Sequence, residues 1–250
     1  MSWQRLRWWL LGAVAYLVFL GATLPAQFMV DRASRHLPGL RLSGVTGSIF
    51  SGSAADLRYQ DTSLGAAEWH FDWLAPFTFT LGYRVALHTD QQYLNTRVDV
   101  GFNRIYLRSL DGRLPVGALE HWLPLPPHSV DGFLTLHLAQ LYLKAGQLVS
   151  AEGEVDLDDA TMRWPAAATL GSFRAGLTPA SGGGIQATVE DVASPLKLHA
   201  DLGLSPQGAY HLKGTLSARD AGDQATHALL ANLGSPDSTG QYPFDFNGQW

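Results

Sequence analysis

The sequence predicts a mostly β protein, in which a single N-terminal transmembrane helix precedes an extended, largely antiparallel β-sheet with one or two short helices. Three observations predict this fold. A segment without charge lies near the N-terminus, apolar and polar residues alternate with a period of two along much of the remainder, and turn-forming residues separate the alternating segments. The composition agrees, because 26 Gly, 13 Pro and 11% aromatic residues are typical of strands and turns.

The predicted transmembrane helix covers residues 8–30. No charged side chain interrupts it, and about 20 residues suffice to cross the hydrocarbon core. Arg5 and Arg7 precede it, so the positive-inside rule predicts a cytoplasmic segment at residues 1–7 and export of residues 31–250. A cleaved signal peptide is the alternative, although Leu24 stands where a cleavage site needs a small residue. The side chains expected to form the anchor are Trp8, Trp9, Leu10, Leu11, Tyr16, Leu17, Val18, Phe19 and Leu20.

The alternating segments predict half-buried strands. Residues 77–88, 196–204 and 210–218 each place apolar side chains on one face and polar side chains on the other, and residues 134–138 do so more briefly. Short connections predict that neighbouring strands pair antiparallel as a meander. Turns are expected at residues 111–112, 131–132, 145–146, 181–184 and 205–208.

Helices are predicted at three places after the anchor. A short helix is expected at residues 31–36, and another at residues 223–233, with Asp223 near its start and Gly234 as its stop. The proline-rich region at residues 112–129 is expected to hold one helical turn around residues 117–122 and to act as a joint between two halves of the sheet.

So few helices cannot cover a long sheet with one apolar face. That face must pack on another sheet, curl on itself, or stay open as a groove. A large exposed apolar face marks a site for a partner or a lipid, whereas ordinary core packing is the alternative for each aromatic side chain. The residues predicted to share this face are Trp69, Phe71, Trp73, Phe77, Phe79, Leu81, Tyr83, Leu198, Leu202, Leu212 and Leu216.

The overall composition excludes several functional classes. The 17 Lys and Arg against 22 Asp and Glu give a net charge of −5, which argues against general nucleic-acid binding. The absence of cysteine removes disulfides, thiolate zinc sites and cysteine nucleophiles. Charged residues make up 16% of the chain against about 25% in a typical soluble protein. This low content indicates that part of the chain lies in lipid or that apolar strand faces are covered.

No motif in the sequence predicts catalysis, a metal or a cofactor. The nine histidines lack the spacing of metal ligands, and Asp156, Asp158 and Asp159 lack the glycine and distal glutamate of a calcium loop. The glycine run at residues 44–52 has neither nucleotide-binding spacing nor a following helix, and no Gly-x-Ser-x-Gly elbow occurs. We therefore expect no enzymatic activity.

Four segments of the chain together resemble one protein family. They are residues 44–54, residues 69–76 followed by Gly82, residues 130–136 leading to residues 153–155, and residues 229–237 followed by a last strand. In order and length the chain is similar to the type II secretion system protein N family, although Phe50 stands where a tryptophan is expected.

This resemblance implies an inner-membrane protein with a single-pass anchor and a periplasmic β-rich domain. It implies a part in the apparatus that moves folded periplasmic proteins across the outer membrane, with other subunits of that apparatus as partners and without catalysis. A more distant resemblance to AsmA-like proteins implies a curved sheet and, as the alternative function, binding or transfer of phospholipid along an apolar groove.

Overall fold

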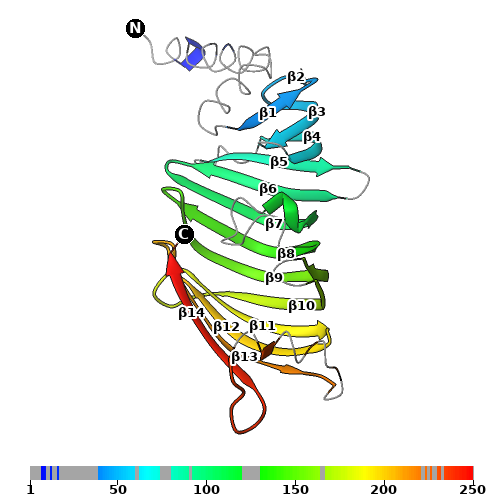
Figure 1. The fold of residues 1–250 in the computed structure, drawn as a ribbon. Coiled ribbons are helices and arrows are strands. Elements are labelled where there is room, and N and C mark those ends of the chain that lie inside the picture. The colour runs from blue at the N-terminus through cyan, green and yellow to red at the C-terminus, as the bar shows by residue number, and fades with distance from the viewer. Residues whose placement is uncertain are drawn as a thin grey trace.

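The computed structural model describes residues 7–9, 12, 16, 39–59, 62–73, 80–89, 92–119, 130–163, 167–220, 223, 226, 230–231 and 234–249. Fourteen strands form one curved sheet, with the N-terminal strands at one end and the C-terminal strands at the other (Figure 1). The strands are β1 Leu40–Ser43, β2 Thr46–Gly47, β3 Ser51–Tyr59, β4 Thr62–Asp72, β5 Leu81–His88, β6 Tyr93–Gly101, β7 Arg104–Pro115, β8 Val130–Lys144, β9 Gln147–Met162, β10 Ala168–Pro179, β11 Ile185–Ala193, β12 Leu196–Leu204, β13 Ala209–Ala218 and β14 Tyr242–Gln249.

The sheet is an antiparallel meander. From β3 to β14 each strand pairs with the next one in the chain, while β1 and β2 both pair with β3. The central strands β8 and β9 have 15 and 16 residues, against about 5–6 in an average strand. The prediction of a mostly β, largely antiparallel sheet is confirmed.

Alternation located the C-terminal strands accurately. The predicted strands at residues 196–204 and 210–218 correspond to β12 and β13, in which Leu202 lies directly opposite Leu212. The connecting turn closes where the Ser205 N–H donates to the Ala209 carbonyl at 2.8 Å. Gly208, with a φ of 87°, takes the left-handed conformation that glycine adopts without strain.

Two predicted turns are wrong, because Asp111–Gly112 lies inside β7 and Asp131–Gly132 lies inside β8. Both pairs adjoin β-bulges, at register shifts between Asn95 and Arg97 and between Asp131 and Phe133. Any Cβ at position 112 would lie 2.9 Å from the Tyr93 carbonyl oxygen. The glycines therefore permit close approach of neighbouring strands rather than chain reversal.

The helical predictions are met in part. The turn expected at residues 117–122 is a 3₁₀ helix at Val116–Leu119. Thr226, Leu230 and Ala231 are helical, and the Asp223 carboxylate accepts hydrogen bonds from the Thr226 N–H at 3.3 Å and from its hydroxyl at 2.5 Å, as an N-cap does. Leu230 is 0% exposed. The helix predicted at residues 31–36 lies outside the described residues.

The hydrogen-bonded ladder continues across the region expected to be a joint. Strands β7 and β8 pair from Arg104 opposite Lys144 to Pro115 opposite Phe133. The sheet is therefore continuous on both sides of the connection, of which residues 120–129 lie outside the described part of the chain.

Most of the predicted anchor lies outside the described residues. Arg7, Trp8, Trp9 and Tyr16 are helical, and the three aromatic side chains are exposed. Within the described ranges, the structure has no helix whose length and apolar character would let it cross a membrane. The anchor positions that fall outside these ranges are Arg5, Leu10, Leu11, Leu17, Val18, Phe19 and Leu20.

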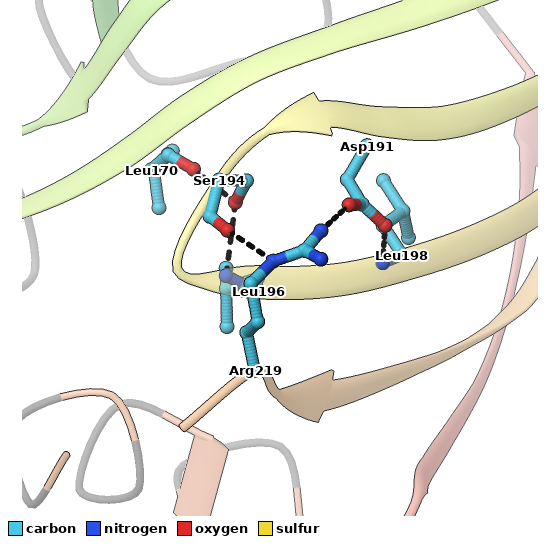
Figure 2. A network of polar contacts seen from close by, with 6 residues as sticks. All are labelled: Leu170, Asp191, Ser194, Leu196, Leu198 and Arg219. Carbon is cyan, nitrogen blue, oxygen red and sulfur yellow. Dashed lines mark hydrogen bonds and ion pairs between the residues drawn. The ribbon is translucent and has the colours of Figure 1, made fainter.

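A polar network fixes the turn between β11 and β12 to the strands on both sides (Figure 2). The Ser194 hydroxyl donates to the Leu170 carbonyl of β10 at 2.5 Å and accepts the Leu196 N–H at 2.9 Å. Arg219, which follows β13, donates to the Ser194 carbonyl at 2.9 Å and forms an ion pair with Asp191. The turn is thereby tied to β10 and to the end of β13.

The chain exposes a large surface for its size. The chain exposes 15811 Å² of surface, whereas a compact monomer of 27.1 kDa would expose about 10,900 Å². The described residues form no second sheet that could pack on the first. Much of the sheet is therefore a single layer.

Candidate functional site: the apolar face and the C-terminal edge

One face of the sheet is apolar from end to end. Cross-strand pairing runs without a break from β3 to β14 through residues that lie directly opposite one another. This apolar row consists of Ala54, Ala67, Leu87, Leu94, Gly112, Leu136, Val155, Ala175, Val189, Ala200, Gly214 and Phe244.

The register places the described residues of the predicted apolar face on the same side as this row. Phe71 lies opposite Tyr83, and Trp69 lies opposite Val85. At the other end of the sheet Leu198 lies opposite Leu216, and Leu202 lies opposite Leu212. Phe77 and Phe79 lie outside the described residues.

This face is only partly covered. Phe71, Leu110, Leu138 and Ile185 are buried. By contrast, Trp73 and Leu81 are 54% and 52% exposed, so neither is a core residue. Partial exposure is shared by Trp69, Tyr83, Leu107, Leu136, Leu141, Val155, Phe173, Val189, Leu198, Leu202, Leu212 and Leu216.

Aromatic rings gather at the N-terminal end of the apolar face. The ring centroid of Phe50 lies 5.1 Å from that of Phe71 and 4.8 Å from that of Trp73, and Phe71 lies 5.2 Å from Tyr83. Burial raises the pKa of the Tyr83 hydroxyl. The sequence indicates Phe50 only as an unusual family position. Its ring contacts, Phe71 of β4 and Trp73 just after it, become its neighbours only when β3 pairs with β4.

The two edges of the sheet differ in regularity. The N-terminal edge consists of the four residues of β1 and the two of β2, with Gly44 at a φ of 63° between them. Such short, bent edges resist pairing with another chain. The C-terminal edge is β14, which pairs with β13 over eight consecutive residues without a register shift and has no neighbour on its outer side among the described residues.

The outward-facing backbone groups of β14 follow from the register. The Ser205 N–H donates to the Ala209 carbonyl, so the backbone N–H and C=O groups of Ala209 point toward β12. These groups alternate in direction from one residue of β13 to the next. The register therefore directs the backbone groups of Tyr242, Phe244, Phe246 and Gly248 toward β13. The groups of residues 243, 245, 247 and 249 therefore point outward. Proline at 243 agrees, since edge strands tolerate proline where its nitrogen faces away from the ladder. Phe246, which follows on the apolar face, is 50% exposed.

Several titratable side chains of the described strands form ion pairs, and Arg174 contacts both Glu154 and Asp156. Three histidines approach carboxylates on the polar face: His137 Nδ1 lies 2.7 Å from Asp111, His199 Nδ1 3.3 Å from Glu190, and His211 Nε2 3.5 Å from Asp245. Among the described residues no group of three or more His, Asp or Glu side chains is arranged to hold a metal ion.

Comparison with protein-family models identifies the family. The model described as type II secretion system (T2SS), protein N matches residues 38–245, which include β1 through β13 and half of β14. The chain belongs to the type II secretion system protein N family. The resemblance noted from the sequence is thus confirmed, and in this family member the matched region contains both the apolar row and the start of the C-terminal edge.

Similar proteins carry the same family name. The type II secretion system protein N of Vibrio cholerae serotype O1 is 28% identical over 236 residues, which cover 90% of this chain and 91% of the relative. The protein of that name from Klebsiella pneumoniae is 26% identical over 99% of this chain and 97% of its own length. The Aeromonas hydrophila protein is 30% identical over 94% and 95%. No solved structure matches this chain.

Proposed function

We propose that this chain is a non-catalytic subunit of a type II secretion system and contributes to the assembly or function of the machinery that exports folded periplasmic proteins across the outer membrane. In this proposal residues 8–30 anchor the chain in the inner membrane, the N-terminus is cytoplasmic, and the sheet lies in the periplasm. Family membership and the names of the similar proteins support a place in the secretion system. The charge-free run behind Arg5 and Arg7 supports the topology.

The observation that carries the mode of action is the open β14 edge. Eight residues in regular register present outward N–H groups at Asp245, Asn247 and Gln249, and an extended segment of another secretion subunit can pair with them as an added strand. Phe244 and Phe246 lie beside each other on the apolar face, with ring centroids 5.7 Å apart, and would accept apolar side chains of that segment.

Replacing Asn247 by proline tests this mode. Proline at this position removes an outward donor but no bond to β13, so the fold should survive as it does with Pro243. The variant should accumulate normally yet lose most secretion when it replaces the native chain in its bacterium, whereas Asn247→Ala should secrete like the native protein. Normal secretion by Asn247→Pro would overturn strand addition at β14.

A second candidate function is binding of phospholipid along the apolar face. The supporting observation is that apolar residues of nearly every strand stay partly exposed on one side of a single-layer sheet. Acyl chains would find there a continuous apolar surface that the protein itself does not cover.

Mass spectrometry of the protein purified in mild detergent tests this second function. Lipid binding predicts phospholipid at a stoichiometric level, and Leu202→Gln should reduce it severalfold because the glutamine side chain enters the apolar face. Asp201→Asn, one residue away on the polar face, is the matched control and should retain the lipid. Absence of stoichiometric lipid from the native chain would refute the idea.

A further inference from the structure

The polar face of the sheet has a hollow that the proposed function does not use. It has a volume of about 470 Å³ and lies over β4 to β7, and its charged and polar lining includes Glu68, His70, Arg84, Asn95, Arg97 and Arg108. Because these residues alternate with those of the apolar row, the hollow and the apolar face lie on opposite sides of the sheet.

Three arginines cross the floor of this hollow in one line. His70 lies directly opposite Arg84, Arg84 opposite Arg97, and Arg97 opposite Arg108. Directly opposed residues have Cβ atoms only about 5 Å apart, and like charges in such pairs destabilise a sheet. This arrangement is unfavourable unless anions compensate it.

The protein compensates two of the three guanidinium groups. Arg108 Nε lies 3.0 Å from an oxygen of Asp99, whose side chain is 10% exposed, and Arg97 lies 3.7 Å from Asp72. Both arginine side chains remain about half exposed, at 60% and 48%, and so keep N–H groups free for a ligand. The Arg84 side chain forms no ion pair or hydrogen bond with the described residues.

A β-bulge positions Arg108 in the line. The register shifts at Ser109, whose φ of 50° is unusual for a residue other than glycine, and the Thr96 hydroxyl donates to the Arg108 carbonyl at 3.4 Å. The extra residue lets Leu107 and Leu110 both stay on the apolar side while Arg108 faces Arg97. Bulges of this kind re-aim side chains and are frequent beside functional sites.

We propose that this hollow binds a phosphate group, held by Arg84, Arg97 and Arg108 with His70 at the rim. Guanidinium groups match phosphate oxygens with paired hydrogen bonds, and adjacent strands present three of them to one multiply charged tetrahedral anion. The phosphate can belong to a phospholipid headgroup or be free. The proposal is independent of the β14 edge and of the apolar face.

Isothermal titration of the full-length chain in a neutral detergent and phosphate-free buffer tests the site. Inorganic phosphate should bind saturably, and Arg84→Gln should weaken this binding at least tenfold. Arg104→Gln removes the same charge from the same face of β7 outside the hollow and should change the affinity less than twofold. Glycerol phosphate, the soluble headgroup mimic, identifies the source: tighter binding than phosphate indicates a lipid headgroup, and equal or weaker binding indicates free phosphate.

The unfolding temperature, measured with and without phosphate, distinguishes loss of phosphate binding from loss of folding. Without phosphate, Arg84→Gln should unfold at the same temperature as the native chain or higher, because one like-charge contact is removed. With phosphate, only the native chain should gain stability. No saturable phosphate binding, equal weakening by Arg104→Gln, or equally tight binding of acetate would each overturn the proposal.

Discussion

Replacing Ser194 by alanine removes a hydroxyl that ties three strands together. Ser194 is 8% exposed, and its loss leaves the Leu170 carbonyl and the Leu196 N–H without their partner in a region where Leu196 itself is buried (Figure 2). A buried polar backbone group without a partner costs about 1–3 kcal/mol. Because water can reach part of the turn, we expect the two groups together to cost about 2–4 kcal/mol.

Urea unfolding followed by circular dichroism measures this loss. For a chain of this size the expected change corresponds to a decrease in Tm of roughly 4–16 °C. Ser43→Ala is the matched control, because the Ser43 hydroxyl makes an exposed 3.5 Å contact to the Asp56 carbonyl, and it should stay within about 0.5 kcal/mol of the native chain. A Ser194→Ala variant as stable as this control would refute the structural role of the network.

Two further predictions concern a bulge and a turn. Gly153→Ala should lower the free energy of unfolding by about 3 kcal/mol or more in the same assay, because φ is 141° and the new Cβ would lie 2.3 Å from the His137 carbonyl oxygen. Gly176→Ala, with open space around it, should change this free energy by less than about 1 kcal/mol. Equal effects of the two substitutions would contradict the assigned register. Hydrogen bonds from Thr239 and from backbone N–H groups, including that of Gln241, lower the pKa of Asp237 below its ordinary value of 3.8, so the turn they form should persist at neutral pH and loosen as pH falls through that lowered pKa. In NMR the Gln241 amide proton should titrate with a midpoint below 3.8, and a midpoint above that value would be inconsistent with these bonds.

The alternation of apolar and polar residues within single strands explains which parts of the fold the sequence predicts. It predicts β12 and β13 at the positions where they lie, since the period of two is a property of each strand alone. The aspartate–glycine pairs at Gly112 and Gly132 predict turns but lie in strands, because a glycine beside a bulge and a glycine in a turn look the same in sequence.

The remaining features depend on the register between paired strands. The line of Arg84, Arg97 and Arg108 exists only because β5, β6 and β7 pair as they do around the bulge at Ser109. The contact of Phe50 with Trp73 and the open edge at β14 likewise follow from which strands become neighbours. No local sequence pattern carries that information.

Site-specific photocrosslinking in cells that assemble the secretion system tests most directly whether the chain acts through its C-terminal edge. A photoreactive amino acid at position 247 should crosslink this chain to another secretion subunit, whereas the same group at Lys197, exposed on the polar face of the interior strand β12, should not. Crosslinks at position 197 alone, or none at position 247 while secretion proceeds, would contradict the account.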